Sequence, residues 1–389
     1  MGSGSNGFRR RTFLARLAAS GALPAALSRC GGEGAPVGLS EGPVILSARG
    51  DRTDTFGLAA VDAADAVVRV SSGFRGHDVT LHPVRSSEAL LFGRRPGFES
   101  IAVDLRSGEV TARLQAAPGR SFQGHGVFDP DGSILFTSEA DLETAQGKIG
   151  VWDGTTYERL TEIDTAGLGP HEILFLPGSG LVAVANGGLL TRPETGRQVL
   201  NLDTMDSSLA YLEPESGRVA EQVRVSAPKA SIRHMDIAAD ETVVFGLQVQ
   251  REALDHDHIV PLMGDHRLGG EPRLFEDSPE VVALFRDYVG SVAVSARYGV
   301  AGFTSPRGDV AGFWSVADGR FSGVVEFADV SGIDAMPDGD RFVLSNSRGE
   351  FRMVDAQTLE EQPDQRRRFD GMRWDNHLLV SDWPLERRV

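Results

Sequence analysis

The sequence predicts an all-β fold, a single seven-bladed β-propeller over residues 43–383. The chain of 389 residues is rich in turn formers, with 46 glycines and 19 prolines. It repeats a pattern of short apolar strands and Gly/Asp/Pro turns in units of about 40 to 60 residues, the length of a four-stranded blade. Residues 44–70 supply only three strands and residues 376–380 a lone one. The C-terminal strand is therefore expected to complete the first blade and leave no open edge.

The individual strands follow from apolar runs bounded by tight turns. Typical turns are DPDG at 129–132 and MPDGD at 336–340, in which glycine supplies the positive φ of a hairpin. The first strands of successive blades begin near residues 77, 125, 171, 234, 291, 333 and 377. Only residues 279–288, PEVVALFRDY, look helical. Two long insertions, at 189–208 and 249–289, are expected on one rim, where a rigid scaffold carries binding residues.

Residues 1–30 have the features of an export signal. Arg10-Arg11-x-Phe13-Leu14 resembles a twin-arginine signal, and the apolar stretch that follows is too short to cross a bilayer. Leu27-Ser28-Arg29-Cys30 partly matches a lipoprotein cleavage box, although Arg29 stands where a small residue is usual. We therefore expect a periplasmic protein exported in the folded state, with no transmembrane helix in the mature chain. A lipid anchor at Cys30 is an open alternative.

Charge and cysteine content exclude several classes of function. The net charge is −16, which argues against nucleic acid or an anionic membrane as a partner and is compatible with cations as ligands. Cys30 is the single cysteine, so an intrachain disulfide and a thiolate metal cluster are excluded. The chain also lacks a Gly-x-Ser-x-Gly elbow, a phosphate loop and a dinucleotide fingerprint, which leaves serine-hydrolase and nucleotide chemistry unsupported.

Histidine recurs at one position of the repeat. Five of the seven first strands begin with histidine, although the chain holds only nine: His77, His125, His171, His234 and His377. The first strand of each blade lines the central channel, so the five imidazoles are expected to face it together. Neutral imidazole is the commonest metal ligand and suits iron and copper. The alternative is that the rings only fill the axis, hydrogen-bonded to backbone and water.

Further polar residues are expected on the same face. Most stand at the ends of second strands, and two adjoin the histidines. Candidates for ligand binding are Arg94, Asn186, Arg233, Gln248, Ser305, Arg307 and Asn346. Glu139 and Glu172 are candidates for a carboxylate ligand, a catalytic base or a group that orients an imidazole.

Several blocks of sequence carry a resemblance to a known family. They include FQGHGVFDPDG at 122–132, GPHEI at 169–173, the long block at 185–212, SIRHMDI at 231–237 and TSPRG at 304–308. On these blocks the chain resembles an uncharacterised family of twin-arginine-exported bacterial propellers encoded beside imelysin-type periplasmic iron-uptake lipoproteins. The resemblance implies a periplasmic propeller associated with iron acquisition, with such a lipoprotein as a partner. It implies no reaction.

Three hypotheses about function follow. The first is a metal-handling protein that binds iron or copper at the histidines. The second is a metal-dependent enzyme at the same site, a lactonase-like hydrolase or an oxidoreductase, in which metal-bound water would be the nucleophile and Glu139 or Glu172 the base. The third is a scaffold that docks a lipoprotein through its loops and needs no metal.

Overall fold

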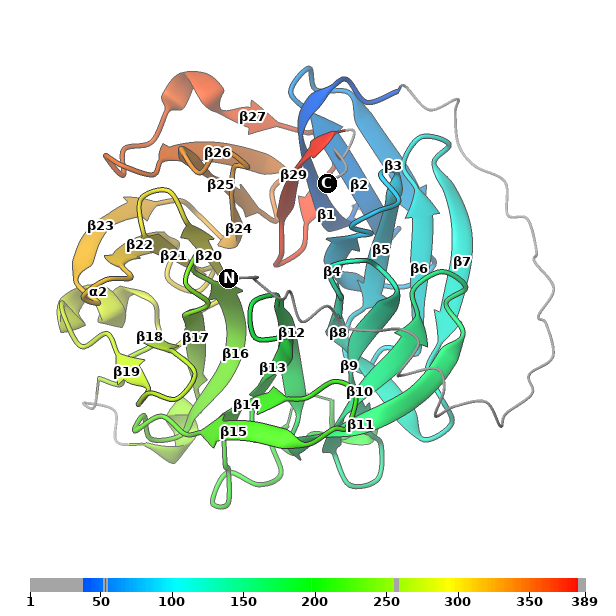
Figure 1. The fold of residues 1–389 in the computed structure, drawn as a ribbon. Helices are drawn as coiled ribbons and strands as arrows, with labels where there is room; N and C mark the ends of the chain where they lie inside the picture. The colour runs from blue at the N-terminus through cyan, green and yellow to red at the C-terminus, as the bar shows by residue number, and fades with distance from the viewer. Residues whose placement is uncertain (1–37, 52, 54, 197, 255–258, 384–389) are drawn as a thin grey trace, which may run out of the picture.

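The protein is a seven-bladed β-propeller. The computed structural model describes residues 38–51, 53, 55–196, 198–254 and 259–383, so the predicted signal at 1–30, with Cys30, lies outside the described residues. Seven antiparallel sheets surround a central axis (Figure 1). Within the part of the chain that is described, no helix is long and apolar enough to cross a membrane.

Each blade runs from an inner strand at the axis to an outer strand at the rim. Blade 1 contains β1 (Gly42–Gly50), β2 (Gly57–Asp62), β3 (Val67–Ser71), β28 (Arg373–Trp374) and β29 (Leu379–Trp383). Blade 2 contains β4 (Gly76–Leu81), β5 (Glu88–Gly93), β6 (Glu99–Asp104) and β7 (Glu109–Gln115); blade 3 contains β8 (Arg120–Phe128), β9 (Ile134–Asp141), β10 (Gln146–Asp153) and β11 (Arg159–Leu168); blade 4 contains β12 (Pro170–Leu176), β13 (Leu181–Asn186), β14 (Ser208–Leu212) and β15 (Val219–Val223). Blade 5 contains β16 (Ala230–Ile237), β17 (Val243–Val249), β18 (Met263–His266) and β19 (Arg273–Leu274); blade 6 contains β20 (Ser291–Ser295), β21 (Val300–Ser305), β22 (Val310–Ser315) and β23 (Phe321–Glu326); blade 7 contains β24 (Val330–Ala335), β25 (Arg341–Asn346), β26 (Glu350–Asp355) and β27 (Arg367–Arg368).

The C-terminal strand closes the ring, as predicted. Strand β29 pairs with β1 from Leu379 opposite Leu46 to Trp383 opposite Gly42, and β28 extends the pairing at Arg49 and Gly50. Figure 1 shows β29 (red) beside β1 (blue) at the axis. Closure removes the unpaired edge that β1 would otherwise present to solvent.

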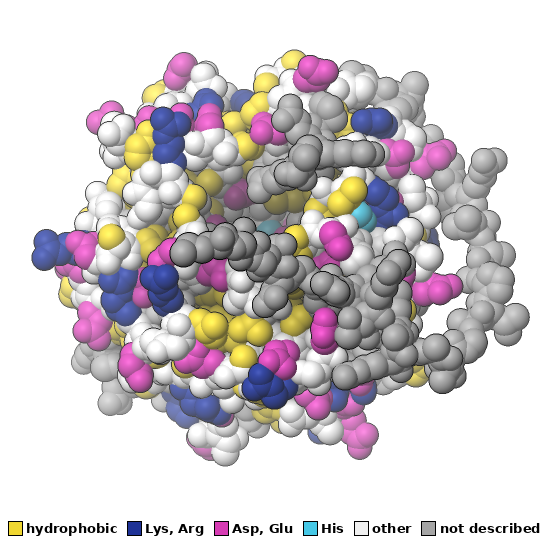
Figure 2. All heavy atoms as spheres, viewed as in Figure 1, with side chains coloured by type: hydrophobic (Ala, Val, Ile, Leu, Met, Phe, Trp, Pro, Cys, Tyr) yellow, Lys and Arg dark blue, Asp and Glu magenta, His cyan; other side chains and the backbone are white. Residues whose placement is uncertain are grey.

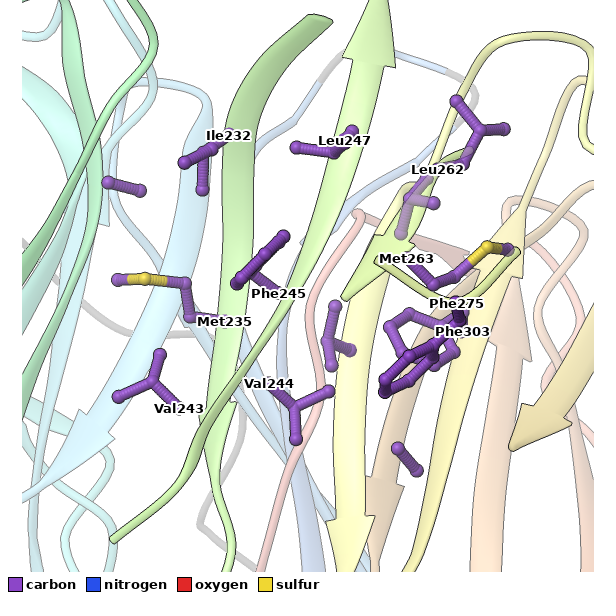
Figure 3. Close-up of a cluster of buried hydrophobic side chains, with 14 of the residues drawn as sticks. Ile232, Met235, Val243, Val244, Phe245, Leu247, Leu262, Met263, Phe275 and Phe303 are labelled. Atoms are coloured by element: carbon purple, nitrogen blue, oxygen red, sulfur yellow. The ribbon is translucent and has the colours of Figure 1, made fainter. Parts of the chain in front are cut away.

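The apolar core lies between the blades and leaves the axis free for polar groups. Six clusters of buried apolar side chains among the described residues fill the interfaces between neighbouring blades. Figure 3 shows part of the largest cluster, in which Phe245 and Leu247 lie on one side of β17 and Phe275 and Phe303 lie on its other side. Second and third strands are buried on both faces, which explains their continuous apolar sequences.

Within the described residues, helical structure is confined to connections between strands. The helix predicted at 279–288 is shorter than expected: α2 covers Pro279–Leu284, because Arg286 and Asp287 adopt a positive φ that ends the helical path. The remaining pieces are single 3₁₀ turns, η1 (Pro193–Thr195), η2 (Arg251–Ala253) and η3 (Pro363–Gln365).

Asp334 on β24 ties blade 7 to the closing strand. Its Oδ2 accepts the backbone N–H of Val380 at 2.6 Å, and its Oδ1 accepts that of Ala335 at 2.8 Å. The pKa of Asp334 is raised to about 8, chiefly by burial and to a smaller extent by the nearby carboxyl groups of Asp236 and Asp78, against the lowering effect of the two hydrogen bonds. The native state therefore holds a proton on this carboxyl near neutral pH.

We expect this proton to make stability depend on pH. The unfolded chain releases the proton near pH 3.8, so the stabilisation is complete below that pH and is lost as pH rises through about 8. One such group changes the unfolding free energy by at most about 1.4 kcal/mol per pH unit. Urea unfolding across this window should show less stability at higher pH, and Asp334→Asn should flatten the dependence. Asp382→Asn, exposed on the same strand, is the control; an unchanged slope in Asp334→Asn would contradict the assignment.

Candidate metal centre

Irregular backbone on the inner strands brings the five histidines to the axis. Blades 2 and 4 each place two residues opposite one on the second strand, His77-Asp78 and His171-Glu172 respectively. In blade 3 the register shifts across Gln123, Gly124 and His125, and in blade 5 the extra residue is Arg233, directly before His234. Such bulges re-aim side chains that regular pleating would send to opposite faces. His377 lies between β28 and β29, where the closing strand is interrupted.

The five imidazoles form one buried cluster. Ring centroids of successive pairs around the cluster are 4.6 to 4.9 Å apart for His77–His125, His125–His171, His171–His234, His234–His377 and His377–His77. No ring is more than 6 % exposed. Two triads bring their ligand nitrogens within 4.8 Å of one another, His77–His125–His377 and His125–His171–His234. His125 belongs to both triads. Histidine side chains are visible in the central hollow (Figure 2).

Most nitrogens of this cluster lack a hydrogen bond. Six buried ring nitrogens have no hydrogen-bond partner among the described residues: both of His77, Nε2 of His125 and His377, and Nδ1 of His171 and His234. Leaving buried polar atoms unpaired is costly. Protein groups of the described residues therefore leave these six nitrogens unsatisfied. This observation fits a group of atoms able to hold a metal ion.

Two of the rings are oriented through their other nitrogen. Nδ1 of His125 is 3.2 Å from Oδ2 of Asp78, and Nδ1 of His377 is 3.3 Å from the hydroxyl of Ser291. Both contacts leave Nε2 as the nitrogen without a partner. A carboxylate or hydroxyl that holds one imidazole nitrogen and leaves the other for a metal is the usual arrangement around metal-ligating histidines.

The electrostatics favour neutral rings. Burial lowers the pKa of His77, His171, His234 and His377 well below the usual range, and neighbouring imidazoles and arginines lower it further. Protonated imidazole cannot bind a metal, so these rings are in the ligand-competent form at neutral pH. Burial also raises the pKa of Glu172 well above its usual range, with Asp78 as the next cause.

Glu172 lies among the histidines, but Glu139 does not. Oε2 of Glu172 accepts the backbone N–H of Met235 at 2.8 Å and lies 3.4 Å from Nδ1 of His234; Oε1 lies 4.0 Å from Nδ1 of His125. Glu139 instead faces the outer strands of blade 3, where Oε1 accepts hydrogen bonds from Thr137 and Arg159. The structure thus brings one of the two candidate carboxylates to the cluster, and the other forms an ion pair within its own blade.

A cavity of about 420 Å³ opens onto the cluster. His77, His171 and His234 line it, together with four of the predicted ligand-binding residues: Arg94, Arg233, Gln248 and Arg307. Both long insertions contribute to its wall, as expected. The other three predicted residues do not line the cavity, and their side chains donate hydrogen bonds to backbone carbonyl oxygens. Asn186 donates to that of Thr165, Ser305 to that of Phe285 and Asn346 to that of Ala328.

Sequence reasoning missed three residues around the site. Asp78 hydrogen-bonds His125, Asp375 holds Arg94 at 2.8 Å and lies 3.5 Å from Nδ1 of His77, and Tyr288 lines the cavity beneath Arg307. Asp78 could have been found, because it follows His77 as Glu172 follows His171. Nothing in the local sequence distinguishes Asp375 or Tyr288 from other loop residues.

Gly124 allows His77 to sit beside the blade 3 strand. Its φ is +109°, and a methyl group there would lie 2.5 Å from Cδ2 of His77. Gly124→Ala should therefore displace the His77 ring as well as strain the backbone, which alone costs about 1–3 kcal/mol. Gly42→Ala is a matched control, with φ +118° and nothing within 4 Å. Thermal unfolding should show the larger loss for Gly124→Ala; equal losses would argue against this close approach.

Comparison with known proteins supports the fold. The structure is similar to a chain of the hydrazine synthase of Kuenenia stuttgartiensis, with a TM-score of 0.59 and 14% sequence identity over 81% of this chain and 90% of that chain. At such low identity the likeness concerns the fold alone. No curated protein matches the sequence. A family model does match residues 70–381, which include all five histidines of the cluster. The chain therefore belongs to the family described as "Protein of unknown function (DUF1513)".

Proposed function

We propose that this propeller binds a transition metal ion, iron or copper, at the five-histidine cluster, and that it acts as a periplasmic accessory protein in iron acquisition. The main support for the metal site is the set of six buried ring nitrogens without hydrogen-bond partners among the described residues. Imidazole nitrogens suit both metals. Within each triad the ligand nitrogens lie no more than 4.8 Å from one another, close enough for one ion to contact all three after small movements of the rings.

Different residues would bind the ion and orient the rings that bind it. His125 contributes Nε2, with Asp78 holding its other nitrogen, and His377 contributes Nε2 against Ser291. His77, His171 and His234 complete the two triads. The bound metal would supply Lewis acidity or redox chemistry, or would itself be the cargo. Glu172 stands beside His234 and His125, ready to take up or release a proton when the charge of the cluster changes.

The role in iron acquisition is supported by the sequence. The twin-arginine pattern at residues 10–14 favours export of a folded protein to the periplasm, and the negative net charge of −16 attracts cations. The resemblance to propellers encoded beside imelysin-type lipoproteins suggests such a lipoprotein as the partner. Lipidation of Cys30 would place the propeller at the same membrane.

A second candidate function is a metal-dependent enzyme. The cavity of about 420 Å³ gives a small molecule access to the rings, and Glu172 is a carboxyl group of raised pKa within reach of two of them. A lactonase-like hydrolase would need both features. Turnover of a panel of lactones by metal-loaded protein, lost in Glu172→Gln, would favour this function over metal handling alone.

The metal site is tested by loading metal-free protein. Equilibrium dialysis against Fe²⁺ under anaerobic conditions, and separately against Cu²⁺ and Zn²⁺, is followed by elemental analysis. We expect folded wild-type protein to retain iron or copper and the double variant His125→Ala, His171→Ala to retain none. His82→Gln alters a buried histidine outside the cluster and should retain metal as the wild type does. No uptake by wild type, or equal uptake by the double variant, would refute the proposal.

A further inference from the structure

The cavity above the histidines is strongly basic, although the protein is acidic. Five arginines line it against one carboxylate, Asp141, which is already paired with Arg120 at 2.6 Å. A cavity of this volume lies within the range of small-molecule sites. Its charge is opposite to the net charge of the chain, so it cannot be explained as a general surface property. The local composition therefore indicates a ligand of negative charge.

Arg233 is the most informative of these arginines. It is the extra residue of the blade 5 bulge and is only 3% exposed. Its Nε is buried without a hydrogen-bond partner, and no ion pair joins its guanidinium to a carboxylate of the described residues. A buried and unpaired guanidinium is expensive to maintain without an anion.

Two other buried charges of the described residues are paired with arginines. The fully buried Glu139 is 2.6 Å from Arg159, and Asp265, 5% exposed, is paired with Arg273. At the cavity, Arg94 is held by Asp375 at 2.8 Å, and Arg307 stacks on Tyr288, 4.4 Å from the ring centroid. These two arginines are positioned by neighbours within the protein. Arg233 differs from Arg94, because its charged and polar neighbours include Arg94, Arg95 and the Tyr288 hydroxyl but no carboxylate of the described residues.

We infer that this cavity binds a small organic polycarboxylate, with Arg233 as the residue that binds one of its carboxylate groups. The planar guanidinium matches a carboxylate in a two-point interaction. Arg233 immediately precedes His234, so an anion bound there lies next to the histidine cluster. A second carboxylate of the same molecule can then face the metal position. The inference rests on the proposed function for the role of the cavity, and it implies that the metal arrives or is retained together with an organic acid.

The test uses citrate as the probe and metal-free protein, so that it does not depend on metal binding. Isothermal titration at low salt should show citrate binding at one site, and citrate should raise the temperature of thermal unfolding. Arg233→Gln should weaken citrate binding by about 30-fold or more, the loss expected when one partner of a buried charge pair is removed. Arg320→Gln, at an exposed turn of blade 6 with its side chain 79% exposed, should bind citrate as the wild type does.

Other arms of the experiment decide between classes of ligand. Trimethyl citrate, which has no charge, should not bind, and inorganic phosphate should bind more weakly than citrate. Phosphate binding as tight as citrate would overturn the polycarboxylate assignment. So would an Arg233→Gln variant that remains folded and binds citrate as tightly as the wild type, or the absence of any heat or stabilisation with wild type.

Folding of the variant provides an independent readout. Because the substitution removes an unpaired buried charge, ligand-free Arg233→Gln should unfold at the same temperature as the wild type or higher. A markedly lower temperature would show that the guanidinium is compensated within the protein, which also contradicts the inference. If the protein takes up metal but does not bind citrate, only this inference is contradicted. If it binds citrate but takes up no metal, only the proposed metal site is contradicted.

Discussion

His125→Ala is expected to weaken metal binding more than removal of any other histidine of the cluster. His125 is the one residue shared by both triads, so its loss leaves neither of them complete. Removing His377 or His234 leaves one triad intact. The loss in His125→Ala should exceed the roughly 10- to 100-fold that removal of an outer hydrogen-bonding partner costs at metal sites.

Competition titrations with a chromophoric chelator would measure these affinities. Asp78→Asn is an informative companion, because it keeps the shape of the group that bonds Nδ1 of His125 and removes its charge. It should weaken binding less than His125→Ala does. If His377→Ala and His234→Ala each weaken binding as much as His125→Ala, the ion is held by all the rings together, and the two-triad description is wrong.

Val380→Asp is expected to destabilise the closed ring by about 3–5 kcal/mol, the range found when a charge is left buried without a partner. Val380 is 8% exposed and packs in the cluster between blades 7 and 1, with Ile45 and Trp374. Its backbone N–H donates to Asp334. An aspartate side chain here would lose water without gaining a cation and would stand near another carboxyl group.

Guanidinium chloride unfolding would report this loss as a lower midpoint. The matched control is Ser381→Asp, which introduces the same charge at the next residue of β29, where the side chain is half-buried. We expect Ser381→Asp to stay close to the wild type. Equal midpoints for the two variants would mean that the closing strand does not hold the interface between blades 7 and 1.

The architecture could be read from the sequence because its causes are local. Strand length, the alternation of apolar runs with Gly/Asp turns, and their repetition are all set by neighbouring residues. Completion of blade 1 by the last strand also followed, since residues 44–70 supply only three strands and β29 pairs with β1. The grouping of the five histidines at the axis could also be predicted, because each stands at the start of the first strand of its blade. The helix predicted at 279–288 was longer than the observed α2, because the positive φ at Arg286 and Asp287 has no clear sequence signal.

Which polar side chains meet was decided by tertiary structure. Glu139 and Glu172 are both acidic residues of channel-proximal strands, but the carboxylate of Glu139 turns outward to Arg159 while that of Glu172 turns to His234. Residues Asn186, Ser305 and Asn346 were expected at the mouth and instead bond backbone carbonyls. At such positions the sequence specifies a polar group but not the partner, which comes from a neighbouring strand or blade.

The sequence by itself determined a seven-bladed propeller with five histidines at one register of its inner strands. Only the tertiary structure decided that these rings pack against one another with six of their nitrogens left without a hydrogen-bond partner, and that Arg233 is buried in the cavity beside them. The physical reason is that periodic patterning specifies which strand a residue belongs to. The bulges that turn His77, His171 and Arg233 toward the cavity depend on pairing with the second strand, and burial depends on how seven blades close around the axis.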